Sequence, residues 1–211
     1  PAGLSNCIGF WRGTRHDVNE LFKAARDVDA VLSRLELPHC LIGGLAVNRW
    51  GRPRATQDVD FTVLVDFGEE RAVSEAILKE FRPRIDDAVR FAVTNRVLLA
   101  ENDAGVPIDI GLAGFPFEEA IISRATGFEF DEAVVVPTAC AEDLIVLKAI
   151  AGRGHDWADI EGIIVRQSDR LDWELITSQL SALAELLPEA DLLPRLGRMR
   201  DELAEEEETD A

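Results

Sequence analysis

Basic residues are scarce in this chain of 211 residues. Its 22 lysines and arginines stand against 40 acidic residues, so the formal net charge is −18. A broad nucleic-acid-binding face requires clustered lysine and arginine to neutralise phosphates, and the composition argues against such a face. The balance mildly favours a small-molecule or protein partner, although a local patch of Arg49, Arg52 and Arg54 could still hold RNA.

Cysteines and long apolar runs are also scarce. The three cysteines, Cys7, Cys40 and Cys140, lie far apart, and their spacing fits neither a disulfide framework nor a metal-binding motif. No apolar run approaches the length of a membrane span, and no signal peptide is evident. These absences predict a soluble, cytoplasmic protein that does not contact membranes.

The spacing of apolar residues changes along the chain from a mixed pattern to a purely helical one. Helical spacing is expected at 17–36, 45–50 and 69–81, and after Pro137 at 141–151, 157–166, 173–187 and 192–205. Strands are expected at 39–42, 59–65, 89–93, 97–100, 106–112 and 133–136.

This order of elements predicts an α/β (α+β) fold, in which a small mixed β-sheet with flanking helices precedes a C-terminal helical bundle. The expected divisions are an N-terminal arm at 1–16, a mixed core at 17–137, a helical region at 138–204 and an acidic tail at 205–211. A cleft between the core and the helical region is the natural place for a ligand.

Two aspartates flank Val59 in the expected strand at 59–65. Because side chains alternate along a strand, Asp58 and Asp60 should share one face, while Val59 and Phe61 face the core. Two carboxylates this close suit a hard cation such as Mg²⁺, which binds oxygen ligands and keeps positions open for phosphates.

A third aspartate, Asp109, lies between Ile108 and Ile110 in another expected strand. If that strand neighbours the first, Asp109 joins the same acidic face and is the natural base for an acceptor hydroxyl. The alternative is a solvated sheet face that carries three unrelated aspartates. We favour a metal site formed by Asp58, Asp60 and Asp109, because a glycine pair precedes the first two.

That pair, Gly43 and Gly44, stands between a strand and a helix, and thirteen residues (45–57) separate it from Asp58. Glycines at such a turn let backbone N–H groups approach a phosphate, whereas a plain tight turn is the alternative. Arg54 and Thr56 in the following loop are candidates to contact a triphosphate or orient the carboxylates.

Lys148, one of only three lysines in the chain, lies in an otherwise apolar helix. A lysine in such a helix needs a buried or cleft-facing partner, for which a nucleotide phosphate would serve, or it extends to solvent at the helix edge. Asp156 and Asp159 follow in the next helix. Asp156 is a candidate helix cap or a partner of Lys148 or Arg153.

Together these motifs resemble the DNA polymerase β-type nucleotidyltransferase superfamily. The signature of that superfamily has three parts. An apolar residue followed by Gly and then Gly or Ser corresponds to Ile42 to Gly44, and an Asp-x-Asp pair corresponds to Asp58 to Phe61. A later isolated acidic residue corresponds to Asp109, within Ile108 to Ile110. The stretch from 43 to 61 is most similar to the AbiEii-like group, which includes MenT-type toxins. The helix of Lys148, with the run from Arg153 to Ile160, also resembles that group.

The resemblance implies the following site. Asp58, Asp60 and Asp109 hold Mg²⁺, with Mn²⁺ as the alternative, and act as catalytic residues together with Lys148. The nucleoside triphosphate contacts Gly43, Gly44, Arg54, Thr56, Lys148, Asp156 and Asp159. Many members carry Ser at the position of Gly44, so here the backbone is expected to bind phosphate without that hydroxyl.

The resemblance also implies the activity: transfer of a nucleoside monophosphate from a triphosphate to an acceptor hydroxyl. The acceptor is left open among RNA such as tRNA, a protein and a small molecule. A toxin of a toxin–antitoxin system, with a cognate antitoxin as partner, is one expected role. The alternative is a non-catalytic nucleotide-binding or partner-binding module of the same fold.

Overall fold

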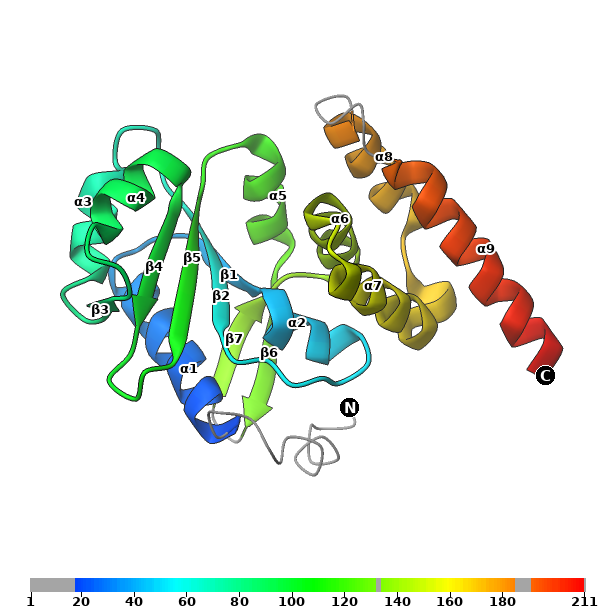
Figure 1. Ribbon diagram of the computed structural model, residues 1–211, viewed down its shortest axis with the longest axis horizontal. Helices are drawn as coiled ribbons and strands as arrows, with labels where there is room; N and C mark the ends of the chain where they lie inside the picture. Colours follow the sequence, from blue (N-terminus) through cyan, green and yellow to red (C-terminus); the bar gives the residue numbers. More distant parts are fainter. Residues whose placement is uncertain (1–17, 132–133, 185–190, 211) are drawn as a thin grey trace. The chain divides into compact units, whose positions relative to one another are not determined.

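The computed structural model describes residues 18–131, 134–184 and 191–210 of the chain, which Figure 1 shows as a ribbon. These residues divide into two units. The first comprises the chain up to Arg49 together with Pro53–Ala139, and the second comprises Trp50–Arg52 together with the chain from Cys140. The N-terminal arm expected at 1–16 lies outside the described residues.

A mixed sheet in the order β3-β4-β5-β2-β1-β7-β6 forms the centre of the first unit. Its strands are β1 (His39–Ile42), β2 (Val59–Leu64), β3 (Arg82–Pro83), β4 (Val97–Glu101), β5 (Pro107–Ala113), β6 (Thr126–Asp131) and β7 (Val134–Thr138). β2 runs parallel to β5, and β1 parallel to β7. The other neighbouring strands are antiparallel. The predicted mixed α/β architecture is therefore confirmed.

Helices α1 (Val18–Arg34), α2 (Gly43–Trp50), α3 (Glu70–Ile77), α4 (Ala88–Asn95) and α5 (Pro116–Arg124) accompany this sheet (Figure 1). α1 packs on β1, β2 and β7. Its residues Leu21, Ala25, Val28 and Leu32 repeat at helical spacing and are fully buried. The hydrophobic core therefore lies between α1 and one face of the sheet, and it includes Phe61 of β2.

The strand expected at 89–93 is wrong, because this segment belongs to α4. Ala88 and Ala92, one helical turn apart, are buried, while Val93 is 39% exposed. The β-branched valines favoured a strand, but packing of the small alanines in the contacts of α4 with α3 and β4 decided the outcome. Elements β3, β6 and α5 were not expected, and α3 ends at Ile77, earlier than expected.

The second unit contains α6 (Ala141–Ala151), α7 (Gly154–Gln167), a short 3-10 helix (Ser168–Arg170), α8 (Trp173–Ala184) and α9 (Leu192–Asp210). α6 packs against α7 and α8, and α8 against α9. The segment 50–52 belongs to this unit because Arg166 donates to the carbonyl of Gly51 at 2.7 Å. α9 continues to Asp210, through residues expected in an acidic tail.

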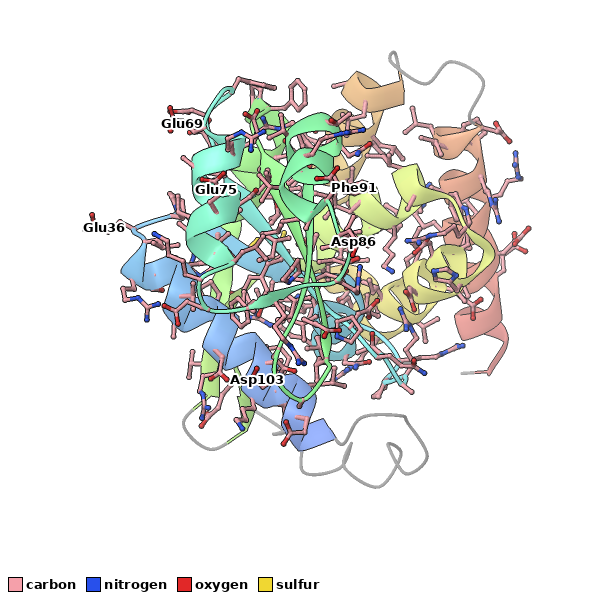
Figure 2. All side chains as sticks on the ribbon, turned by 60° about the vertical axis from the view of Figure 1, so that its left-hand side comes forward. Glu36, Glu69, Glu75, Asp86, Phe91 and Asp103 are labelled. Atoms are coloured by element: carbon pink, nitrogen blue, oxygen red, sulfur yellow. The ribbon has the colours of Figure 1, made fainter. Side chains whose placement is uncertain are left out.

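Acidic side chains contribute to the exposed surface of the first unit. Glu36, Glu69, Glu75, Asp86 and Asp103 are all exposed, and they lie around the outside of its helices and loops in Figure 2. These exposed charges account for part of the negative net charge of the chain. None of the described helices combines the length and apolarity that crossing a membrane requires.

Candidate active site

The three predicted aspartates belong to neighbouring positions of the sheet in the first unit. Asp60 of β2 and Asp109 of β5 are partners in the parallel register. Val59 and Ile108, which flank them, are fully buried in the core. Side-chain alternation therefore directs Asp60 and Asp109 to the face opposite the core. Asp58 directly precedes β2 and lies near enough for its negative charge to raise the pKa of Asp109.

Gly43 lies against the carboxylate of Asp60. β1 pairs with β2 so that Ile42 is opposite Asp60, and Gly43 follows with a left-handed backbone, φ +66°. A Cβ atom on Gly43 would lie 1.9 Å from Asp60 Oδ2 and 2.6 Å from Asp60 Cβ. The position requires glycine both for its backbone conformation and for the close approach of Asp60.

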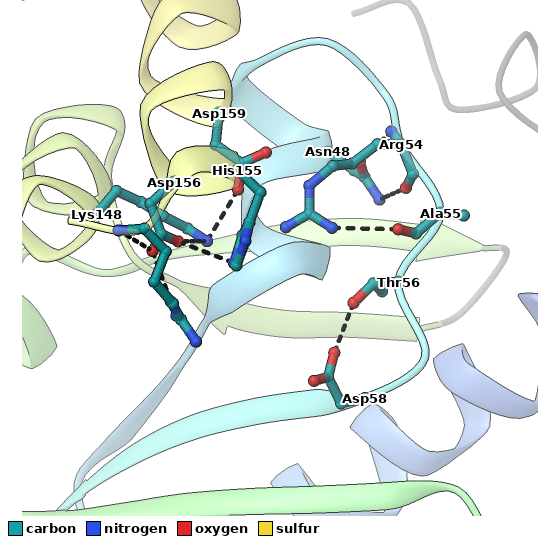
Figure 3. A network of polar contacts seen from close by, with 10 residues as sticks. Asn48, Arg54, Ala55, Thr56, Asp58, Lys148, His155, Asp156 and Asp159 are labelled. Carbon is teal, nitrogen blue, oxygen red and sulfur yellow. Dashed lines mark hydrogen bonds and ion pairs between the residues drawn. The ribbon is translucent and has the colours of Figure 1, made fainter. Parts of the chain in front are cut away.

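Gly44 has a comparable neighbour in Thr56. A Cβ atom on Gly44 would lie 2.4 Å from Thr56 Oγ1 and 3.5 Å from Arg54 Nη2. The Thr56 hydroxyl donates to Asp58 Oδ1 at 2.6 Å, as Figure 3 shows. Thr56 therefore fills the space of a side chain at position 44, and its hydroxyl lies beside the glycine pair.

Asn48 holds the loop that carries these residues and was not singled out from the sequence. Its amide donates to the carbonyl of Arg54 at 3.1 Å, and its Oδ1 accepts from the Arg54 N–H at 2.9 Å (Figure 3). Asn48 is 3% exposed. This reciprocal pair attaches the loop to α2, so Arg54 and Thr56 are positioned from the helix. The sequence signal that could have identified Asn48 is a polar residue among the apolar residues of α2, because a buried polar side chain needs a hydrogen-bond partner.

Arg84 is a second residue that the sequence did not indicate. Its Nη2 lies 2.6 Å from Asp109 Oδ1. Burial raises the pKa of Asp109 above its ordinary value, with a further contribution from the charge of Asp58, and Arg84 only partly offsets this. The Asp109 carboxyl is therefore less acidic than an ordinary aspartate, although it has a positively charged neighbour.

The donor chemistry of this face fits Mg²⁺, since three carboxylates on one sheet face offer oxygen ligands. Within the described residues, however, no group of three His, Cys, Asp or Glu side chains is arranged to hold a metal ion. Asp58 contacts the Thr56 hydroxyl, and Asp109 contacts the Arg84 guanidinium. Binding of an ion therefore requires side-chain adjustment.

Lys148 of the second unit lies between two aspartates of α7. Its Nζ is 2.9 Å from Asp156 Oδ1 and 2.9 Å from Asp159 Oδ2, and all three residues are buried. Burial alone would raise the pKa of Asp156, but its hydrogen bonds with Arg153 and Lys148 outweigh burial and lower it. Asp156 is both a partner of Lys148, as Figure 3 shows, and a helix cap, because it also accepts from the Arg153 N–H at the start of α7.

The sequence of residues 27–209 matches the family described as "Nucleotidyl transferase AbiEii toxin, Type IV TA system". The chain belongs to this AbiEii family. It is therefore a nucleotidyltransferase, as the resemblance of its motifs implied, and a member of a toxin family of toxin–antitoxin systems. No curated protein matches the AbiEii chain in sequence.

Solved structures show the same fold for this AbiEii family member. The solution structure of the antibiotic-resistance factor ANT(2″)-Ia superposes with a TM-score of 0.52 at 21% identity, over 81% of this chain and 95% of that one. An antigenic nucleotidyltransferase-like protein from Paracoccidioides brasiliensis superposes with a TM-score of 0.51 at 16% identity, over 87% and 93% of the two chains. At these identities the likeness concerns the fold alone.

The arginines considered for an RNA patch have other contacts. Arg49 donates to the carbonyl and the hydroxyl of Thr126 and lies over the ring of Phe128. Arg52 pairs with Glu161 at 3.0 Å within the second unit. Arg54 donates to the carbonyl of Ala55 at 3.1 Å. Each guanidinium has a structural contact, which weakens the case for a ready-made RNA-binding patch.

Proposed function

We propose that this nucleotidyltransferase transfers a nucleoside monophosphate from a nucleoside triphosphate to an acceptor hydroxyl, with Mg²⁺ held by Asp58, Asp60 and Asp109. The observation that carries the proposal is the register of β2 and β5, which directs Asp60 and Asp109 to one face beside Asp58. Mn²⁺ is the alternative ion. A bound divalent ion would stabilise the negative charge of the triphosphate during transfer.

In the proposed reaction, the acceptor oxygen forms a bond to the α-phosphorus, and the bond from that phosphorus to the oxygen bridging to the β-phosphate breaks. Pyrophosphate leaves with the electron pair of the broken bond. The proton of the acceptor hydroxyl passes to the carboxylate of Asp109. Asp109 is assigned this role because it is the isolated third carboxylate of the face, opposite Asp60 in the register.

The triphosphate would be held by the glycine pair and the following loop. Gly43 and Gly44 begin α2, where backbone N–H groups and the helix dipole favour negative charge. The guanidinium of Arg54 lies next to Gly44, and the Thr56 hydroxyl fills the remaining space there. We assign both side chains to phosphate oxygens.

Lys148, Asp156 and Asp159 would form the nucleotide contact of the second unit. An ammonium group has three protons, and among the described residues two carboxylates accept from Lys148. We assign its third proton to a phosphate oxygen. The two aspartates then act by holding the ammonium group in position.

The acceptor is proposed to be RNA such as tRNA, a protein or a small molecule, and a cognate antitoxin is the proposed regulatory partner. The family description supports the antitoxin, because it places the family in toxin–antitoxin systems. The fold neighbour ANT(2″)-Ia is named an antibiotic-resistance factor, which supports including small hydroxylated molecules among the acceptors tested.

The test is incubation of the protein with each NTP labelled at the α-phosphate, Mg²⁺ or Mn²⁺, and panels of RNA, protein and small-molecule acceptors. Label should move to one acceptor class with release of pyrophosphate. Asp58→Asn should abolish the transfer. Asp103→Asn, which removes an exposed aspartate from a different loop, serves as the matched control and should keep full activity.

Absence of transfer to every acceptor with either ion would overturn the proposal. The non-catalytic alternative has a distinct signature in calorimetry. A nucleotide-binding module would bind NTP with an affinity that neither removal of Mg²⁺ nor Asp58→Asn changes, whereas the proposed enzyme should bind NTP more weakly in both cases.

A further inference from the structure

We propose that Arg84 is an intramolecular counter-ion of the acidic face, which competes with a divalent cation for Asp109 and must leave this carboxylate when the cation binds. This inference rests on the proposed function, because it concerns the same site. It adds a residue that controls cation affinity and that none of the sequence motifs contains.

The sheet brings Arg84 across a neighbouring strand to Asp109. β3 pairs antiparallel with β4, and the Arg84 N–H continues this pairing by donating to the carbonyl of Leu99 at 3.1 Å. Leu99 is in turn the register partner of Asp109 in β5. Arg84 and Asp109 thus lie on either side of one β4 residue, and the long arginine side chain spans the interval to reach a contact of 2.6 Å.

The Arg84 guanidinium and a divalent cation are both positively charged, so they cannot contact Asp109 Oδ1 at the same time. A guanidinium nitrogen 2.6 Å from Oδ1 takes the position that a cation liganded by this oxygen would need. The guanidinium and the divalent ion also repel each other at that distance. Asp109 Oδ1 is therefore available to a cation only in the fraction of molecules from which Arg84 has moved away, and the apparent affinity of a site that uses this oxygen falls by that fraction.

The same contact stabilises the protein before the cation arrives. The side chain of Asp109 is 33% exposed and its charge is disfavoured by burial and by Asp58. Arg84, whose side chain is 29% exposed, offsets part of this cost and holds the carboxylate in place. The pair is accessible enough to open, since an arginine at the sheet edge can turn toward solvent.

The experiment is a calorimetric titration of the full chain with Mn²⁺, without nucleotide, for the natural protein and four variants. Arg84→Gln should bind Mn²⁺ roughly three- to tenfold more tightly, because the competing charge is gone. Arg84→Lys keeps a positive charge and should bind within about twofold of the natural protein. Arg84→Ala is a second test should the glutamine variant fail to fold.

Arg82→Gln is the matched control. Arg82 lies two residues earlier, is 55% exposed and pairs with Glu101. The variant loses the same charge from the same edge without touching Asp109, so its Mn²⁺ affinity should not change. Thermal unfolding without metal should show a lower melting temperature for Arg84→Gln than for the natural protein.

The outcomes separate the two proposals. Equal or weaker Mn²⁺ binding by both Arg84→Gln and Arg84→Ala would overturn the role of Arg84 while leaving the enzyme assignment intact. An equal gain from Arg82→Gln would overturn it as well, since the effect would then be one of general charge. Absence of Mn²⁺ binding in every variant would overturn the metal site and this inference together, whereas Mn²⁺ binding without nucleotidyl transfer would overturn only the enzyme.

Discussion

Replacement of Gly43 by alanine would place a methyl group where the carboxylate of Asp60 now lies. The new Cβ would be 1.9 Å from Asp60 Oδ2, 2.4 Å from Asp60 Cγ and 2.6 Å from Asp60 Cβ. Rotation of the carboxylate cannot relieve all three contacts, because the Asp60 Cβ is attached directly to the backbone of β2. Either Asp60 moves with its strand or the start of α2 shifts.

Two costs add at this position. An L-residue at φ +66° costs about 1–2 kcal/mol relative to glycine. Overpacking of a site that can relax only through its backbone adds about 1–3 kcal/mol. We expect Gly43→Ala to lower the free energy of unfolding by about 2–5 kcal/mol. Transfer should fall about 100-fold or more, because a displacement near 1 Å of a catalytic group has that effect.

Gly105→Ala is the matched control. Gly105 also has a left-handed backbone, φ +77°, but a Cβ atom there would meet nothing within 4 Å. The free energy of unfolding of Gly105→Ala should therefore fall only by the backbone contribution, about 1–2 kcal/mol. The variant should keep its transfer rate and Mn²⁺ affinity. Urea unfolding, Mn²⁺ calorimetry and initial transfer rates at saturating NTP measure these quantities. Equal stability and equal transfer rates in the two alanine variants would show that the contact between Gly43 and Asp60 imposes no steric constraint.

Three further predictions concern the same groups of residues. Gly44→Ser should reduce transfer at least tenfold and lower the free energy of unfolding, because the new Cβ would lie 2.4 Å from Thr56 Oγ1. Adding Thr56→Gly should restore part of the lost stability, and a double variant no more stable than the single one would contradict a clash between the two side chains. Asp109→Asn should abolish transfer yet unfold no more easily than the natural protein at pH 7.5. Because the pKa of Asp109 is raised, its stabilising contribution is present at low pH and is lost as pH rises through that pKa. In urea unfolding, the free energy of unfolding of the variant should therefore rise relative to that of the natural protein between pH 4 and 7.5. A relative rise toward low pH instead would contradict this sign. Lys148→Met should cost about 3–5 kcal/mol in urea unfolding, since it leaves two buried carboxylates without their ammonium partner, and a loss below about 1 kcal/mol would show that these charges are not mutually dependent.

Local patterns were enough to predict much of the fold. The alternation around Val59 and Ile108 identified β2 and β5, and the helical spacing after Pro137 predicted α6 at its observed bounds. The pattern around Val89 misled, because valine suits a strand wherever it is half-buried. In α4 the buried residues are Ala88 and Ala92. Alanines give no strong local signal, and the helix is stabilised by its packing against α3, which lies elsewhere in the sequence.

For the candidate site, too, some features could be predicted from local patterns and others could not. The residue types and the sheet faces they occupy follow from the sequence alone: an aspartate pair at spacing two, an isolated aspartate between isoleucines, and a glycine pair at the end of a strand. These follow from the period of a strand and the backbone freedom of glycine, which are properties of neighbouring residues. The membership in a nucleotidyltransferase family agrees with the combination.

The contacts between residues far apart in the chain depend on how the strands pack together. The parallel register of β2 and β5 places Asp60 opposite Asp109, and the position of β3 beside β4 brings Arg84 to the same carboxylate. Periodicity shows which face a side chain occupies but not which strand lies next to it. Strand order and register depend on packing between segments far apart in the chain, and these contacts leave no local pattern around Arg84 from which its partner could be predicted.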